Sequence, residues 1–337
     1  MIERLFHRWE QRLADFSKDD RVQRPFDWGL EWIGSNGAHA SPLDALRLWV
    51  NNVMNDTDAF FTPSPTKDYT LTDNELTFPS SLETPHPANN VVHARFFPTR
   101  ERAGQPRRAV VVLPQWNSDA GGHIGLSQLL ARVGISALRI SLPYHDRRMP
   151  PELTRADYIV SSNVARTVQV CRQAVLDVRR AVWWLRDQGY ERIGLLGTSL
   201  GSCLAMLAAS HEPLVRAQAL NHVSPFFADV VWRGVSTAHV RAGLDGHITL
   251  DLLRELWRPI SPWSYLDRHH DRKTLLVYAK YDLTFPLDLS QTLIDEFRRR
   301  NIPTEVAMLP CGHYTTGQTP FKFLDGYYLS RFLVKNL

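Results

Sequence analysis

The sequence predicts an α/β fold in which a mostly parallel central sheet carries helices on both faces. From residue 108 onward, segments typical of strands alternate with segments typical of helices. The strand segments are short continuous apolar runs, such as residues 109–113, which is the pattern of strands buried on both faces. Such alternation requires right-handed crossover connections between parallel strands.

The beginning of the chain differs, because it has the pattern of amphipathic helices. Apolar residues recur there at helical spacing, at Ile2, Leu5, Trp9 and Leu13. A second helical run covers residues 43–61, and short strand-like pieces follow at 75–78 and 91–97. We therefore predict a helical N-terminal extension over residues 1–65 and a main domain over residues 66–337.

Within the main domain the elements can be placed in order. Strands are predicted at 109–113, 137–142, 193–196, 217–221, 274–278 and 304–309. Helices are predicted at 124–133, 164–185, 203–209, 289–299 and from residue 321 onward. Residues 223–270 have no strand pattern but are rich in aromatic residues and leucine. We predict a helical cap inserted over the carboxyl-terminal edge of the sheet; the alternative is an element that packs at its side.

Composition narrows the function classes. The chain has 337 residues, 44% of them hydrophobic, and a net charge of +4 without a basic patch, so no nucleic-acid partner is expected. The three cysteines have no C-x-x-C spacing, which argues against a disulfide framework and a structural zinc site. No apolar run approaches the length of a membrane span, and the first residues are too charged for a signal peptide. We expect a cytoplasmic protein, and nothing in the sequence indicates its oligomeric state.

The most informative motif is Gly197-Thr198-Ser199-Leu200-Gly201. It lies between the predicted strand 193–196 and the predicted helix 203–209, which is the context of a nucleophile elbow. A serine at the apex of such a turn has a strained backbone, and the chain comes close to itself on both sides. Glycines at 197 and 201 avoid the collisions that side chains would cause there. The alternative is an ordinary glycine-rich turn.

A serine hydroxyl needs a base, usually histidine, and a carboxylate that orients it. Parallel sheets collect active-site residues at the carboxyl ends of their strands. Asp282 stands in the loop after strand 274–278, and His313 stands in the loop after strand 304–309. The order Ser, Asp, His along the chain is the one expected after a nucleophile elbow. Asp288 is the alternative acid, although it lies on the following helix and is more simply a surface charge.

These three motifs together resemble the α/β-hydrolase superfamily, over roughly residues 90–337. The nearest branches are the esterases and the dienelactone-hydrolase-like or peptidase-like enzymes. The resemblance implies a carboxylesterase-like serine hydrolase that cleaves an acyl ester through an acyl-enzyme intermediate, with no metal or other cofactor. The partner expected of such an enzyme is a small-molecule acyl substrate. The alternatives are an acyltransferase, a thioesterase or a peptidase with the same triad, or a catalytically silent α/β-hydrolase scaffold used for binding.

The sequence departs from the superfamily at the predicted oxyanion hole. Members usually carry His-Gly after the third strand, whereas this chain has Leu113-Pro114-Gln115-Trp116-Asn117. Proline has no N–H and cannot donate to an oxyanion. We therefore expect the backbone N–H of Trp116, or less favourably that of Gln115, to act together with the N–H of Leu200.

Two further segments are predicted to lie near the site. If residues 223–270 form a cap, one or more of its aromatic residues should line the acyl pocket, the candidates being Phe226, Phe227, Trp232 and Trp257. The alternative is that all four only pack in the core. The loop at 143–148 is expected to be a structural, hydrogen-bonded loop, with contact of Arg147 or Arg148 to a substrate carboxylate as a second possibility.

Overall fold

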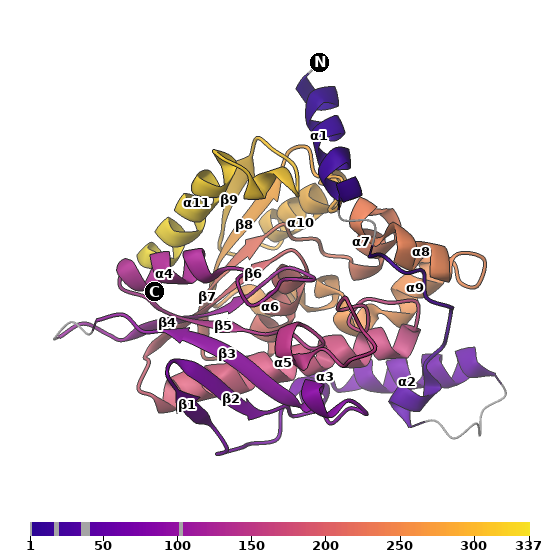
Figure 1. The fold of residues 1–337 in the computed structure, drawn as a ribbon, viewed down its shortest axis with the longest axis horizontal. Helices are drawn as coiled ribbons and strands as arrows, with labels where there is room; N and C mark the ends of the chain where they lie inside the picture. The colour runs from indigo at the N-terminus through magenta and orange to yellow at the C-terminus, as the bar shows by residue number, and fades with distance from the viewer. Residues whose placement is uncertain (1, 17–19, 35–40, 101–103) are drawn as a thin grey trace.

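A single mixed sheet organises the protein (Figure 1). The computed structural model describes residues 2–16, 20–34, 41–100 and 104–337, and within these ranges the sheet has nine strands in the order β1-β2-β3-β5-β4-β6-β7-β8-β9. The strands are β1 Thr70–Thr72, β2 Glu75–Pro79, β3 Val91–Phe97, β4 Arg108–Leu113, β5 Ser136–Ile140, β6 Arg192–Thr198, β7 Val215–Asn221, β8 Lys273–Ala279 and β9 Thr304–Leu309. From β5 to β9 along this order, all neighbouring strands are parallel. The pairs β1–β2, β2–β3 and β3–β5 are antiparallel. The mostly parallel sheet is confirmed.

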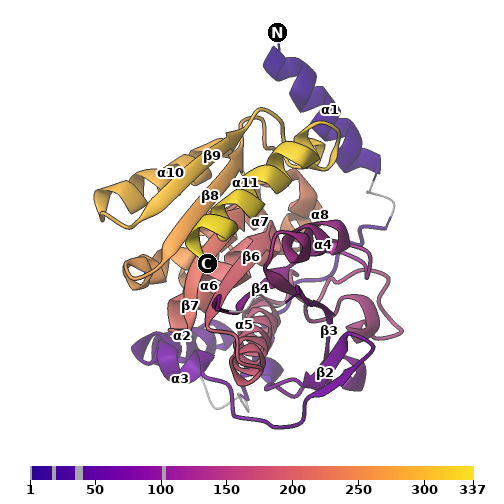
Figure 2. The same cartoon turned by 90° about the vertical axis from the view of Figure 1, so that its left-hand side faces the viewer.

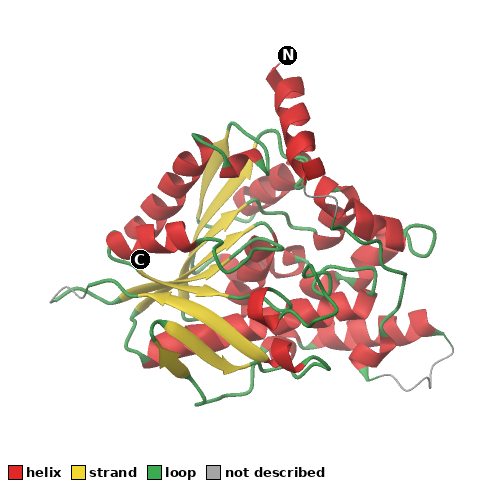
Figure 3. Cartoon of the chain, viewed as in Figure 1, coloured by secondary structure: helices red, strands yellow, loops and turns green. Residues whose placement is uncertain are grey.

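Helices cover both faces of this sheet, as Figure 2 and Figure 3 show. The helices of the main domain are α4 Ile124–Arg132, α5 Val164–Asp187, α6 Leu200–His211, α10 Leu287–Arg299 and α11 Phe321–Asn336. Val110 and Val112 of β4 pack in one core with α4 and α11, while Val111 and Leu113 pack in the other core with α5 and α6. Every position from Ala109 to Leu113 is therefore buried, which explains the unbroken apolar run over these residues.

The predicted elements of the main domain appear close to the expected positions. One strand is shorter than expected, because β5 ends at Ile140, residues 141–142 lie outside the strand and the chain turns at residues 143–144. One helix is longer, because α6 begins at Leu200, directly after the elbow serine. Both differences lie at the carboxyl-terminal edge of the sheet, where the loops carry the candidate site.

The N-terminal region is helical, with α1 Ile2–Phe16, α2 Pro42–Asn55 and α3 Thr57–Phe61. Helix α2 begins after Ser41, whose hydroxyl accepts a hydrogen bond from the Asp44 N–H and caps the helix. The core that contains α5 also includes side chains of α2 and α3, namely Leu46, Val50, Val53, Phe60 and Phe61. Helix α1 lies apart from them, near the loops that follow β8 and β9 (Figure 1).

The segment between β7 and β8 contains α7 Phe227–Arg233, α8 Ala238–Leu244 and α9 Leu250–Leu256, which lie together in Figure 1. Its described residues include no strand, as expected. Many of its apolar side chains are buried in the core that contains α5 and α6. The segment is therefore a packed helical insertion, and α7 reaches the candidate site described below.

Candidate active site

The elbow serine occupies the junction between β6 and α6. Ser199 has φ 56° and ψ −120°, a strained positive-φ conformation that costs a non-glycine residue about 1–3 kcal/mol. A Cβ on Gly197 would overlap the backbone of Gly201, and a Cβ on Gly201 would overlap the Leu113 carbonyl. The Ser199 N–H donates to the Asn221 carbonyl over 2.8 Å, which fixes the turn against β7. The two glycines are thus required by close backbone approach.

The structure brings Ser199, Asp282 and His313 together at the carboxyl ends of three parallel strands. The Ser199 hydroxyl lies 3.1 Å from Nε2 of His313, and Nδ1 of His313 lies 3.0 Å from Oδ2 of Asp282. Nδ1–H of His313 donates to the carboxylate, so its Nε2 carries the lone pair that accepts the serine proton. Asp288, the alternative acid, is exposed and pairs with Arg233 over 2.7 Å.

Asp282 is buried and held by four hydrogen bonds. Its Oδ1 accepts the backbone N–H groups of Thr284 and Phe285 over 2.8 and 2.7 Å, and its Oδ2 accepts His313 and a second histidine. Burial raises the pKa of Asp282, but the charge of His313 and the hydrogen bonds of both histidines outweigh it and hold the pKa well below its usual range. The carboxylate is therefore ionised at neutral pH.

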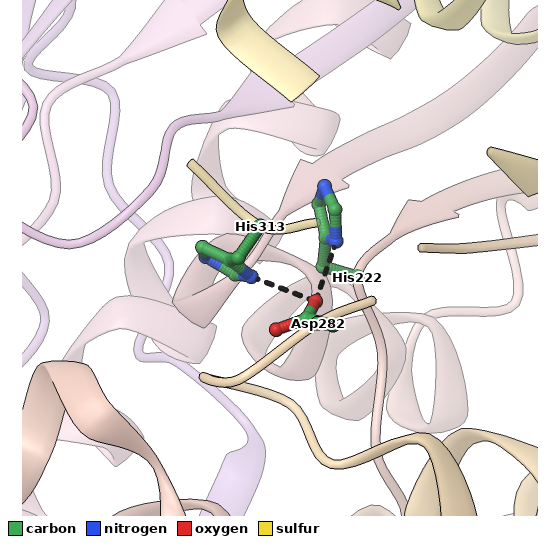
Figure 4. A group of neighbouring side chains, drawn as sticks. All are labelled: His222, Asp282 and His313. Carbon is green, nitrogen blue, oxygen red and sulfur yellow. Dashed lines mark hydrogen bonds and ion pairs between the residues drawn. The ribbon is translucent and has the colours of Figure 1, made fainter. Parts of the chain in front are cut away.

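The second histidine on Asp282 is His222, which was not among the residues predicted from the sequence. Its Nδ1–H donates to Oδ2 of Asp282 over 2.9 Å, so the two histidine rings converge on one oxygen, as Figure 4 shows. Burial and the neighbouring charge of His313 lower the pKa of His222. Since His222 directly follows β7, the position of active-site residues after parallel strands was a signal for it.

The ring of His313 is fixed and electrically biased by its neighbours. Phe285 stacks on it with 5.3 Å between ring centroids and 6° between planes. Burial lowers the pKa of His313, but the charge and hydrogen bond of Asp282, together with the charge of Glu10, raise it above the ordinary value. The protonated form, which must exist after proton transfer from Ser199, is thus stabilised.

The same group could be considered as a metal site. One ligand atom each from His222, Asp282 and His313 lies within 4.8 Å of the others. Metal binding would require both Nδ1 atoms to give up their protons, whereas their distances of 2.9 and 3.0 Å to Oδ2 are those of hydrogen bonds. The arrangement is explained by hydrogen bonding alone.

The predicted oxyanion residues lie around Ser199. Leu200 opens α6, and Gln115 and Trp116 lie in the loop after β4; all three line the cavity that contains Ser199. His145 supports this loop, because its Nε2 accepts the Asn117 N–H over 2.9 Å and its Nδ1–H donates to the Pro143 carbonyl over 2.9 Å. Burial lowers the pKa of His145 to about 4, so the ring stays neutral.

The loop at 143–148 is therefore structural. Arg148 is fully buried and pairs with Asp177 over 2.8 Å, and neither Arg147 nor Arg148 lies in the cavity wall. This corrects the possibility that one of these arginines meets a substrate carboxylate. Asp146 likewise pairs with Arg139 over 3.0 Å.

A cavity of about 880 Å³ opens beside Ser199. Phe226 and Phe227, at the start of α7, form part of its wall. Trp257 is instead fully buried and its indole N–H donates to the Val164 carbonyl, while Trp232 packs under the Arg241 guanidinium. Neither tryptophan lies in the wall of the described cavity. The prediction that Trp232 or Trp257 contacts the substrate is therefore not supported, whereas Phe226 and Phe227 remain candidates.

An acid with one buried carboxylate oxygen also borders this cavity. Asp325 on α11 accepts a hydrogen bond from the Asn221 side chain over 2.9 Å, and its other oxygen has no partner among the described residues. Burial raises the pKa of Asp325 to about 7, with the Asn221 hydrogen bond opposing it. This carboxyl is therefore partly protonated near neutral pH.

Comparison with known proteins places the chain in a family. Residues 66–256 match the family described as alpha/beta hydrolase domain containing 18. The chain belongs to this family. The matched residues include the elbow serine but end before the loops of Asp282 and His313 and begin after α1–α3. No curated protein sequence matches this family member.

Solved structures confirm the α/β-hydrolase fold of this alpha/beta hydrolase domain containing 18 family member. Pyrococcus horikoshii acylaminoacyl peptidase is 15% identical with a TM-score of 0.61, over 81% of this chain and 42% of the peptidase, so this chain spans less than half of that protein. Acetyl xylan esterase 1 from Thermoanaerobacterium is 13% identical with a TM-score of 0.59, over 96% and 98%. A hyperthermophilic esterase from Pyrobaculum calidifontis is 16% identical with a TM-score of 0.52, over 98% and 97%.

Within the described residues of this family member, no helix is both long enough and apolar enough to span a bilayer.

Proposed function

We propose that this protein is a serine hydrolase that cleaves a carboxylic ester through an acyl-enzyme intermediate. The observation that carries the proposal is the continuous hydrogen-bond chain from Asp282 through His313 to Ser199, at a strained elbow on the wall of a cavity. A serine, a histidine and an ionised carboxylate in this geometry are the parts that nucleophilic acyl transfer requires. A silent binding scaffold has no need of this alignment.

In the first half of the reaction, the Ser199 oxygen attacks the ester carbonyl carbon while Nε2 of His313 takes the serine proton. The carbonyl π electrons move to the oxygen, which becomes an oxyanion, and the N–H groups of Leu200 and Trp116 are proposed to hold it. Asp282 stabilises the imidazolium through its charge and hydrogen bond. The tetrahedral intermediate then expels the alcohol oxygen, which receives the proton from His313.

In the second half, water takes the place of the alcohol. His313 removes one proton from the water as its oxygen attacks the acyl carbon, and the bond from that carbon to Ser199 breaks with return of the proton to the serine oxygen. The carboxylic acid leaves and the free enzyme is restored. His222 fits a positioning role, because it donates to the same Oδ2 of Asp282 as His313 does, with 4.4 Å between the two ring centroids.

An ester is preferred over an amide for a chemical reason. An ester releases an alkoxide, which leaves more easily than an amide nitrogen and demands less of the general acid. Phe226 and Phe227 give the cavity an apolar wall that suits an apolar acyl chain. The fold itself does not choose, since proteins named esterase and peptidase both share it.

Turnover of p-nitrophenyl esters of graded acyl length tests the proposal. We expect hydrolysis by the wild-type protein that rises above the spontaneous rate and is lost in Ser199→Ala. Ser264→Ala is the matched control, since this hydroxyl is exposed, donates to the Arg258 carbonyl and lies outside the cavity wall. Hydrolysis that persists undiminished in Ser199→Ala would overturn the proposal.

A further inference from the structure

Helix α1 lies against both loops that carry the acid and base of the candidate triad. Figure 1 and Figure 2 show this helix beyond the ends of β8 and β9, far in sequence from the loops it meets. It also lies outside residues 66–256, which match the family. Its contacts with the two loops are made by Phe6 and Glu10.

Glu10 holds the histidine loop directly. Its Oε2 accepts the Tyr314 N–H over 2.9 Å and its Oε1 accepts the Thr315 N–H over 2.7 Å. Both N–H groups come immediately after His313, so the carboxylate fixes the backbone from which the imidazole projects. The side chain of Glu10 is fully buried, and its hydrogen bonds are charge-assisted and therefore strong.

Gly312 shows how tightly Glu10 fits this loop. A Cβ at position 312 would overlap Cγ, Cδ and Oε1 of Glu10. The glycine beside His313 is thus explained by the carboxylate rather than by a left-handed backbone, since its φ is not positive. Glu10 and Gly312 form one close contact that a single added methyl group would break.

Phe6 contacts the acid loop one turn earlier on the same helix. Its ring stacks on Tyr281, the residue before Asp282, with 4.6 Å between centroids and 12° between planes. The Tyr281 N–H donates to the Cys311 carbonyl over 2.9 Å, which ties the acid loop to the histidine loop. Helix α1 therefore holds the two loops as one unit.

The composition of α1 does not suit a helix that serves only to fill a core. Its apolar side chains at Ile2, Leu5 and Phe16 are 63%, 59% and 91% exposed, whereas the charged Glu10 is 0% exposed. Burying a carboxylate is unfavourable unless each oxygen finds donors. The helix thus buries an acid at one place, the loop of His313, and leaves most of its apolar surface in solvent.

We propose that α1 is a positioning element of the active site and that Glu10 is its positioning residue. By fixing the backbone at Tyr314 and Thr315, Glu10 keeps the His313 ring within reach of both Ser199 and Asp282. The inference rests on the proposed hydrolase function and adds to it a residue that acts through His313 without touching the substrate.

Kinetics of Glu10→Gln and Glu10→Ala test this role, with Glu3→Gln as the matched control on the exposed side of the same helix. We expect kcat to fall about 10–100-fold in the Glu10 variants, the range for a small misplacement of a catalytic group. KM should change little, because none of residues 2–16 lines the described cavity. Glu3→Gln should match the wild type.

A pH profile separates positioning from general stabilisation. The titratable groups around the His313 ring are Asp282 after β8, His222 after β7, Glu10 on α1 and, on its own loop, Tyr314 and Cys311. Removing the negative charge of Glu10 disfavours the imidazolium and lowers the pKa of His313. The acidic limb of kcat/KM should therefore move to lower pH in Glu10→Gln, which loss of packing alone would not produce.

Gly312→Ala gives a second route that does not depend on the folding of Glu10→Ala. The added methyl group should displace the Glu10 carboxylate and reduce kcat as Glu10→Ala does. In the double variant Glu10→Ala/Gly312→Ala the carboxylate is already absent, so the added methyl group has nothing to displace. The loss of kcat in the double variant should therefore be no larger than in Glu10→Ala alone. If the kcat losses of the two single variants multiply in the double variant, the inference is wrong. It is also wrong if Glu10→Gln has the same kinetics and pH profile as Glu3→Gln while hydrolysis still depends on Ser199. Loss of Ser199 dependence itself would refute the hydrolase proposal instead.

Discussion

The substitution Asp282→Asn probes the centre of the proposed mechanism. Oδ1 accepts two backbone N–H groups and Oδ2 accepts two histidine N–H groups, so the carboxylate provides acceptors on both sides. An asparagine has one acceptor oxygen and one NH₂ group. If its oxygen keeps the backbone bonds, its NH₂ group faces Nδ1 of His222 and of His313.

Because an NH₂ group cannot accept the Nδ1 proton, the His313 ring must then change its tautomer. With the proton on Nε2, His313 presents a donor to Ser199 and cannot take the serine proton. A wrong tautomer of this kind lowers kcat by about 10⁴, or ~5 kcal/mol in the activation free energy. We expect this loss for Asp282→Asn with KM nearly unchanged, measured with p-nitrophenyl acetate, and with circular dichroism to establish that the variant is folded.

Asp288→Asn is the control for this experiment. Asp288 is exposed and paired with Arg233, so its substitution should leave kcat within about twofold of the wild type. If Asp282→Asn retains more than a tenth of the wild-type kcat, or if Asp288→Asn is the damaging change, the assignment of the acid is refuted.

Three further predictions follow from the site. Phe226→Ala and Phe227→Ala should shift the preferred acyl length while the acetyl ester is cleaved at a similar rate; equal losses on every ester, tracking a fall in melting temperature, would mean that these rings only pack. Gln115→Ala should keep most activity, since only a side chain is removed, and a loss of about 10²–10³ in kcat at unchanged stability would show that the amide side chain is the oxyanion donor. The pKa of Asp325 is raised to about 7, so between about pH 4 and pH 7 the folded protein keeps a proton that the unfolded chain has lost. The free energy of unfolding of the wild type therefore falls as the pH rises through this range. Asp325→Asn should therefore be more stable than the wild type at pH 8, by up to ~4 kcal/mol, and equal at pH 4 in denaturant titrations; equal stability at both pH values would contradict the raised pKa.

Much of the fold could be predicted because burial on both faces leaves a direct record in the sequence. The run at 109–113 is apolar at every position since alternate residues face two separate cores. The elbow and the residues after β8 and β9 could be found for a related reason. Strand ends in a parallel sheet determine which loops meet, so Asp282 and His313 could be predicted from the strand positions together with the order Ser, Asp, His along the chain.

Other parts of the site depend on contacts that no local pattern records. Glu10 and Tyr314 are 304 positions apart, and a glutamate on an amphipathic helix looks like a surface charge. The sequence could not show which aromatic residues of the insertion line the cavity and which are buried in the core. Phe227 and Trp257 are both apolar, and only packing decides which of them faces the cavity. The role of His222 was not predicted for a different reason. This residue lies between the end of β7 and the start of the insertion, where the sequence pattern changes.

Covalent labelling with a fluorophosphonate tests the central claim most directly. The claim is that Ser199 is activated by His313 and Asp282. Mass spectrometry of the labelled protein should find one phosphonate adduct per chain, on the peptide that contains Ser199. Labelling should be absent in Ser199→Ala and strongly slowed in His313→Ala. An adduct on another residue, or a labelling rate in His313→Ala equal to that of the wild type, would contradict the account.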